Sequence, residues 1–170
     1  MDQITGLSFE EELYSAISML SFWEEGKAVA TKGGVSFEME NISAVEEFRA
    51  LGMVSLDVRE EERPVEFLTL GLILAVDMEP ENAEAAIPAL HDVNLAFKEG
   101  LFYIDEDRNL CYEANFPVLR GDLEGSLKLF IAAYDETRTF IDGVFPFLLR
   151  LAARPQDADF REYLLTMLGE

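Results

Sequence analysis

The sequence predicts an α+β domain built from helices and antiparallel strands. Apolar residues recur at helical spacing near both ends of the chain, whereas apolar and polar residues alternate along parts of its middle. The 170 residues, of which 49% are hydrophobic, suffice for one domain with its own core, and no repeat or low-complexity linker divides them. We therefore expect a single domain over residues 1–170.

The first predicted element is a helix over about 8–24. Ser8 and Glu11 have the spacing of a capping box, in which each side chain accepts a hydrogen bond from the other residue's backbone. Gly26 is the expected stop. The apolar residues at helical spacing are Phe9, Leu13, Ile17 and Leu20.

A β-hairpin is predicted next. Apolar and polar residues alternate over 35–40, and 27–31 offers a short partner strand. The pair Gly33-Gly34 between them lacks the further glycines and the helix start of a phosphate-binding loop, so it indicates a hairpin turn.

A second helix is expected after the hairpin, because Ser43 and Glu46 repeat the capping-box spacing and Gly52 offers a stop. The apolar residues behind this box are Val45, Phe48 and Leu51. Alternation then predicts a strand over 54–59, which the charged turn EEERP follows.

A longer strand, antiparallel to the preceding one, is predicted over 65–76. Between Phe67 and Val76 both of its faces are apolar, which is typical of a central strand covered on two sides. We expect the cover to come from the chain's own helices or from another subunit.

The segment 79–100 predicts a helix that ends at Gly100, with Pro88 in its first turn or at a break near its start. Its apolar series is Ile87, Leu90, Val93 and Phe97. Two short strands are then expected over 101–105 and 109–117.

A long helix is predicted from Asp122, and Gly143 and Pro146 are expected to kink or interrupt it. Arg154-Pro155 provides its stop, and a last short helix is expected over about 157–168. The apolar residues of the long helix are Leu123, Leu127, Ile131, Tyr134, Ile141, Phe145 and Leu148.

The charge of the chain restricts its partners. The 34 acidic residues against 13 basic ones give a formal net charge of -21, which repels nucleic-acid phosphates and anionic lipids. We therefore expect no nucleic acid and no membrane partner, and a protein partner is expected to be basic. The acidic residues are spread along the chain without a single acidic tail, which also fits solvated helix faces and turns.

A cytoplasmic location is expected. The amino terminus has neither the basic nor the long apolar region of a secretory signal, and the longest apolar run, 67–76, is too short for a membrane span. The one cysteine, Cys111, cannot form an intrachain disulfide, as is usual in a reducing compartment.

The stretch FYIDEDRNLCYE partly resembles a calcium-binding loop, because Asp105, Asp107 and Asn109 occupy alternate positions. The sixth position holds Leu110 where such a loop needs glycine, and the twelfth holds Phe116 where it needs glutamate. We therefore expect no metal and no cofactor, and a hairpin turn in which Asp and Asn side chains bond to their own backbone.

His91 and Cys111 are the only residues of their kinds, so they form the one thiol-imidazole pair that the composition permits. Their spacing does not bring them together, since His91 falls on a predicted helix and Cys111 on a strand beside Glu113 and Asn115. We expect a surface histidine and an inert thiol, and no catalytic residue.

The order of the predicted elements resembles the fold of type III secretion chaperones and, more closely, the YbjN family that shares it. That family's pattern has a helix asparagine, a glycine-led step into a strand, an acidic turn, and a late aspartate and proline in the long helix. The likeness is best over 85–150. The matching residues are Asn94, Gly100, Phe102, Asp105, Asp142 and Pro146.

This resemblance implies an antiparallel sheet packed against helices, often in a homodimer, without catalytic residues. YbjN proteins are described as bacterial sensory transduction regulators, and secretion chaperones hold segments of partner proteins. The helix after Pro155 departs from the pattern. We therefore expect a non-enzymatic, chaperone-like or regulatory module that acts as a homodimer and captures a segment of a partner polypeptide.

The alternative function is that of a small metal-dependent or hydrolytic enzyme that uses carboxylates with His91 or Cys111. It rests on the abundance of carboxylates and on the presence of His91 and Cys111. The sequence shows no buried carboxylate pair, since no Asp or Glu interrupts the strongest apolar segments.

Overall fold

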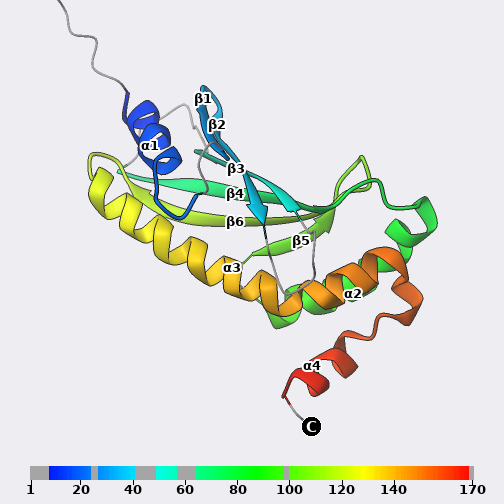
Figure 1. Ribbon diagram of the computed structural model, residues 1–170. Coiled ribbons are helices and arrows are strands. Elements are labelled where there is room, and N and C mark those ends of the chain that lie inside the picture. The colour runs from blue at the N-terminus through cyan, green and yellow to red at the C-terminus, as the bar shows by residue number, and fades with distance from the viewer. Residues whose placement is uncertain (1–7, 24–26, 41–48, 57–63, 98–99, 169–170) are drawn as a thin grey trace, which may run out of the picture.

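The computed structural model describes residues 8–23, 27–40, 49–56, 64–97 and 100–168. These residues form a six-stranded antiparallel sheet and four α-helices, so the predicted α+β class is confirmed (Figure 1). The predicted succession of helix, strands, helix, two strands and long helix is also present. The elements are α1 (Phe9–Ser18), β1 (Ala28–Thr31), β2 (Gly34–Glu40), β3 (Arg49–Leu56), β4 (Val65–Ala75), α2 (Pro80–Ala96), β5 (Leu101–Ile104), β6 (Leu110–Leu119), α3 (Leu123–Ala153), a 3-10 turn (Pro155–Asp157) and α4 (Phe160–Leu168).

The sheet has the strand order β1-β2-β3-β4-β6-β5, and each neighbouring pair is antiparallel. Its longest strand, β4, lies inside the sheet between β3 and β6, as predicted. Strands β1 and β5 form the two edges.

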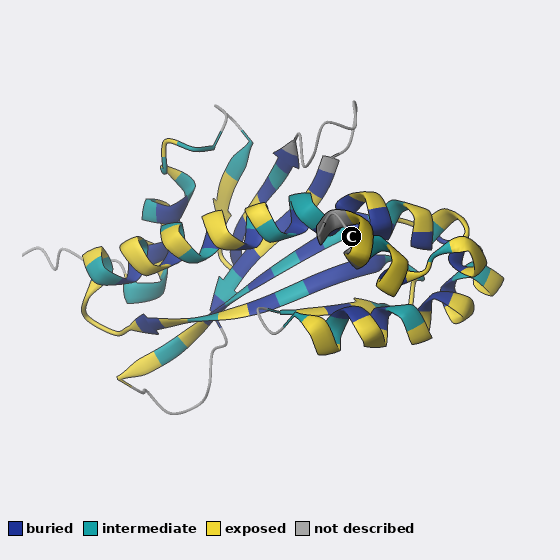
Figure 2. Cartoon of the chain, turned by 90° about the horizontal axis from the view of Figure 1, so that it is seen from below, coloured by how far each residue is buried: buried dark blue, intermediate teal, exposed yellow. Residues whose placement is uncertain are grey.

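The described helices gather on one face of the sheet. Figure 1 shows α2 and α3 beneath the strands, and Figure 2, seen from below, shows the helices in front of them. Helix α3 packs along β6, and α1 packs against β1, β2 and α3. The sheet and the helices therefore form two layers with one core between them.

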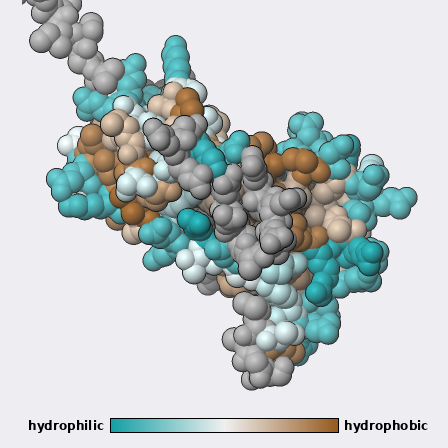
Figure 3. All heavy atoms as spheres, viewed as in Figure 1, coloured by the Kyte–Doolittle hydropathy of each residue, from teal (hydrophilic) through white to brown (hydrophobic). Residues whose placement is uncertain are grey.

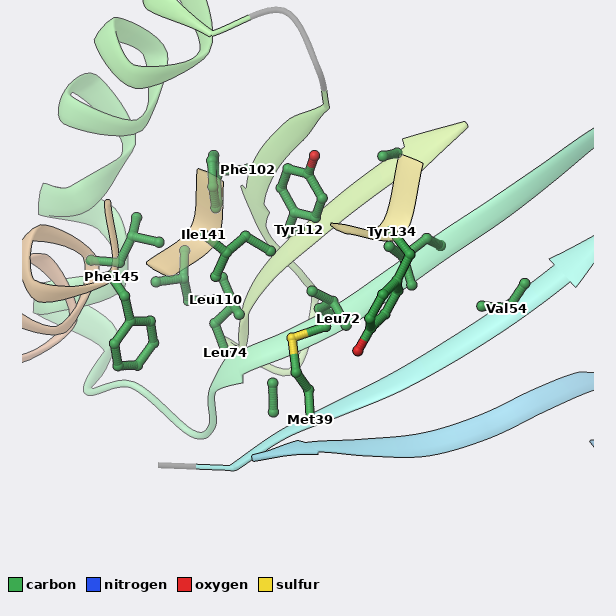
Figure 4. Close-up of a cluster of buried hydrophobic side chains, with 14 of the residues drawn as sticks. Met39, Val54, Leu72, Leu74, Phe102, Leu110, Tyr112, Tyr134, Ile141 and Phe145 are labelled. Carbon is green, nitrogen blue, oxygen red and sulfur yellow. The ribbon is translucent and has the colours of Figure 1, made fainter. Parts of the chain in front are cut away.

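The core lies between α3 and the inner side chains of the strands. Leu70, Leu72 and Leu110 are fully buried, as are Ile141 and Phe145 of α3. Figure 4 shows side chains of both layers in this cluster. Burial of this apolar surface is the main source of stability for the two-layer arrangement.

Helix α1 begins as predicted and ends earlier. The Ser8 hydroxyl accepts a hydrogen bond from Glu11 N, and the Glu11 carboxylate accepts one from Ser8 N at 2.8 Å. The helix ends at Ser18 because the chain turns to bring Trp23 back, whose indole N–H donates to the Ile17 carbonyl at 2.6 Å. The predicted stop at Gly26 lies outside the described residues.

The helix predicted behind Ser43 and Glu46 is wrong over its described part. Residues 41–48 lie outside the described ranges, and Arg49–Leu56 forms β3, so the strand predicted over 54–59 starts earlier. Gly52 is inside β3, where a Cβ would lie only 2.1 Å from the Phe37 ring. This glycine makes room for an aromatic side chain and does not end a helix.

Pro88 and Pro146 lie inside helices and do not break them. Pro80 occupies the first turn of α2, and Pro88 lies within that helix, so the predicted position of Pro88 is wrong. Helix α3 likewise runs past Gly143 and Pro146 without interruption. Both interior prolines are exposed, and water can bond the carbonyl groups that lack their N–H partner.

Helix α4 is anchored to α3 by aromatic side chains. The ring of Phe147 lies 5.1 Å from that of Phe160 and 5.5 Å from that of Tyr163, and the Tyr163 hydroxyl donates to the Gly143 carbonyl. Figure 1 shows α4 on the side of α2 and α3 that faces away from the sheet. The last segment is thus a 3-10 turn and a helix, where one helix over 157–168 was predicted.

Candidate functional site

Strand β4 has two unlike faces. Leu68, Leu70 and Leu72 point toward the helices and are at most 1% exposed, whereas Phe67 on the opposite face is 43% exposed. Cover of both faces by the chain's own helices was one of two predicted arrangements. For the described residues it is wrong, because α1, α2 and α3 pack on the same side of the sheet.

The other strands repeat this division. Every exposed large apolar side chain of the described strands lies on the face opposite the helices, as the strand register shows. We call this surface the open face. Its exposed apolar residues are Val29, Leu51, Met53, Val65, Phe67, Leu101, Tyr103 and Leu119.

The register makes the open face continuous from strand to strand. Leu51 of β3 pairs with Ile73 of β4, and Ile73 pairs with Cys111 of β6, which in turn pairs with Tyr103 of β5. Directly paired side chains in a sheet lie close enough to touch. The surface seen in Figure 3 is mostly hydrophilic around its outline, with hydrophobic side chains gathered in patches. An apolar surface that extends over several strands is typical of an interaction site.

One acidic residue, Glu113, lies within the apolar rows of the open face. Its neighbours in the register are Gly71 on β4 and Leu101 on β5. Burial raises the pKa of the nearby Tyr103 hydroxyl, and the negative charges of Glu113 and Asp105 raise it further. The open face therefore combines apolar contact surface with negative potential.

A shallow hollow of about 300 Å³ lies at the β1 end of the open face. Its lining includes Val29 and Leu51 together with the charged residues Lys27 and Glu38. Glu38 is the register partner of Leu51, so a second carboxylate of the open face borders apolar surface.

The β5 edge of the sheet is closed by α2. The Asn94 side chain donates from Nδ2 to the Phe102 carbonyl and accepts from the Phe102 N–H, both at 2.8 Å. An edge strand whose outward backbone groups are bonded in this way cannot use them to pair with another strand. Asn94 and Phe102, two of the family-pattern residues, thus act together as a clamp.

The charged tip at Asp105 is a hairpin turn, as predicted. The Asp105 carboxylate accepts hydrogen bonds from Asp107 N at 3.0 Å, Asn109 N at 2.8 Å and Asn109 Nδ2 at 2.9 Å. Donation from the Asn109 backbone is the largest cause that lowers the pKa of Asp105. Arg108 has a φ of 63° and completes the turn.

The structure does not bring His91 and Cys111 together. His91 is exposed on α2, whereas Cys111 lies on the open side of β6, across the sheet from the helices. The Cys111 thiol is buried, and burial raises its pKa to about 11, with a further contribution from the Asp105 charge. A thiol with this pKa is protonated at neutral pH and is a poor nucleophile.

The remaining family-pattern residues are Gly100, Asp142 and Pro146. A Cβ on Gly100 would lie 2.4 Å from the Tyr112 hydroxyl oxygen, so only glycine fits there without a shift. Asp142 lies four residues before Pro146, whose missing N–H leaves the Asp142 carbonyl without its usual helical donor. The side-chain oxygen Oδ1 of Asp142 is buried and has no hydrogen-bond partner within the described part of the chain.

Within the described ranges, no three His, Cys, Asp or Glu side chains are grouped so that they could hold a metal ion. Among the helices of those ranges, none combines the length and the apolar character that crossing a membrane requires.

Comparison of the chain with protein-family models, with curated proteins and with solved structures gives no match. The candidate site therefore rests on the geometry of the open face.

Sequence reasoning identified single strands but missed the open face as a unit. Leu51 was assigned to a helix, and Met53 was assigned to no element. The available signal was that the period of two of the predicted strand, extended toward the amino terminus, places the apolar residues Leu51 and Met53 on the same face as Ser55.

Proposed function

We propose that the protein is a non-enzymatic binding module, chaperone-like or regulatory, that captures a segment of a partner polypeptide on the open face. The observation that carries the proposal is the set of half-exposed apolar side chains on a sheet whose other face is packed. Leu51, Met53 and Phe67 are 53%, 46% and 43% exposed. Covering the exposed part of each side chain with a partner would contribute about 1 kcal/mol to the binding free energy. Several such residues together would give a measurable affinity.

The scaffold supports the same function. The order of the elements is the order that the resemblance to YbjN proteins and secretion chaperones implies. The pattern residues Asn94, Phe102 and Gly100 make contacts that fix the backbone, as expected for a family pattern that maintains a scaffold. The homodimer that the resemblance implies stays a prediction.

Selective retention of a partner tests the proposal. Purified protein is immobilised and exposed to lysate from its own source, beside a variant with Leu51→Ser, Met53→Ser and Phe67→Ser. A matched control carries Met19→Ser, Leu95→Ser and Leu129→Ser, which are exposed apolar residues on helices or at a helix end. We expect one set of proteins to be retained by wild type and control and lost from the open-face variant.

Circular dichroism verifies that each variant is folded, and light scattering of the wild type measures the predicted homodimer. Equal retention by the open-face variant and the wild type would contradict the proposal, because the residues that carry it would then contribute nothing to binding.

A further inference from the structure

We infer that the segment captured on the open face is a basic amphipathic helix, one of whose Lys or Arg side chains pairs with Glu113. The inference rests on the proposed function and names the chemistry of its partner. Three observations carry it: the packing of a helix on the sheet, the position of Glu113 and the net charge of the chain.

The first feature is that the sheet packs a helix on its face. Its inner face carries α3, which packs along β6 and whose buried residues Phe130, Tyr134 and Ile141 recur at helical spacing. A second helix with an apolar stripe of similar width can pack on the outer face. Pairing of an added strand with β5 is disfavoured, because Asn94 occupies the outward backbone groups of Phe102.

The second feature is the surrounding of Glu113. The register partner of Gly71 on β3 is Met53, so Glu113 shares one row with Met53, Gly71 and Leu101. Gly71 has no side chain, and a Cβ built on it would meet nothing closer than the Met53 carbonyl oxygen at 4.0 Å. Space therefore remains beside the carboxylate for an incoming ammonium or guanidinium group.

A purely apolar partner would bury Glu113 without compensation, which is costly for a charged group. A partner with a cation at this point would instead form a charge-assisted hydrogen bond in a partly desolvated site. The apolar side chains of the open face therefore favour a partner with an apolar stripe, and Glu113 favours a partner with a basic residue next to that stripe.

The third feature is the net charge of -21, which separates this partner from a second copy of the chain. Two copies facing each other across the open face would bring like charges together, including Glu113 of each copy. A basic helix is instead attracted by the negative potential of the chain, and its binding is expected to weaken as salt is added.

Three labelled synthetic peptides of about 18 residues, a length that spans the sheet as a helix, provide the probes. One has a leucine stripe with lysine at the remaining positions, a second has the same stripe with glutamate, and a third is the lysine peptide scrambled to remove the stripe. Fluorescence anisotropy is measured with wild type, Glu113→Gln and the matched control Glu84→Gln, which alters an exposed carboxylate on α2.

We expect the striped lysine peptide to bind wild type and Glu84→Gln equally and the other two peptides to bind far less. Glu113→Gln is expected to weaken the binding of the striped lysine peptide about tenfold. Equal affinity for Glu113→Gln and Glu84→Gln, or equal binding of the lysine and glutamate peptides, would overturn the inference, as would failure of the striped lysine peptide to bind.

The open-face variant of Leu51, Met53 and Phe67 separates this inference from the proposed function. If it loses all peptide binding while Glu113→Gln loses none, the open face binds polypeptide and only the role of Glu113 is wrong. If it binds every peptide as wild type does, both proposals fail. A wild-type dimer that this variant dissociates would place a second copy on the open face and overturn the inference.

Discussion

The side-chain amide of Asn94 forms two hydrogen bonds with the backbone of Phe102, one to its carbonyl and one from its N–H, each 2.8 Å long. Asn94 belongs to α2 and Phe102 to β5, so these bonds join a helix to the edge of the sheet. They also occupy the outward backbone groups of Phe102, so these groups cannot pair with an added strand at the β5 edge.

Substitution of Asn94 by alanine is expected to destabilise the fold by about 2 kcal/mol, because two backbone groups of Phe102 lose their partners. Urea unfolding measures the change. Asn82→Ala on the same helix is the control, since its one side-chain bond, to the Ala153 carbonyl, is 3.3 Å long and exposed. A loss for Asn94→Ala no larger than that of the control would contradict the clamp.

Gly100→Ala is expected to destabilise the protein by roughly 1–3 kcal/mol, because the new methyl group would meet the Tyr112 hydroxyl and the Glu113 carbonyl. Gly143→Ala is the matched change in α3, where nothing lies within 4 Å of the new Cβ. It is expected to stabilise by about 0.5–1 kcal/mol through helix propensity. Thermal unfolding of both variants checks this prediction, and an unchanged midpoint for Gly100→Ala would refute it.

Stability is expected to fall in alkaline solution. Burial raises the pKa of Cys111 from 9.0 to about 11 and that of Tyr134 from 10.0 to about 12. The folded protein therefore holds protons that the unfolded chain releases, so the stability from these groups is complete below pH 9 and is lost as pH rises through the folded pKa values.

Urea midpoints measured from neutral pH to about pH 10.5 test this sign. Cys111→Ala is expected to lessen the fall above pH 9, whatever its effect at neutral pH. A midpoint that stays constant or rises over this range would show that burial does not keep these two groups protonated in the folded state.

Local sequence patterns predicted the elements that are determined by residues close to one another in the sequence. The Ser8–Glu11 capping box and the turn bonds of Asp105 join residues two to four positions apart, and both are present. The prediction over 65–76 also succeeded, because a long apolar run without helix breakers fits a central strand.

The same patterns failed where a distant residue decides the structure. Gly52 was expected to end a helix, but its role depends on the ring of Phe37, which reaches it across two paired strands. Pro88 was expected near the start of a helix, but Pro80 occupies that position. Helix and strand propensities of single residues do not include such tertiary contacts.

The open face itself could not be predicted from single segments. Leu51 and Leu101 are fifty positions apart, and only the strand order places both on one surface. The sequence showed that β4 is apolar on both faces but not which of its two faces the helices cover. That choice depends on the packing of α3, which no local pattern encodes.

The central claim is that binding occurs on the open face, and methyl NMR of the methionines tests it most directly. Met53 lies on the open face and is 46% exposed, Met39 is buried in the core at 2%, and Met19 is 81% exposed at the end of α1. On titration with the striped lysine peptide, the Met53 methyl signal is expected to shift while those of Met39 and Met19 stay in place. A shift of Met19 with Met53 unchanged, or no shift at all, would contradict the account.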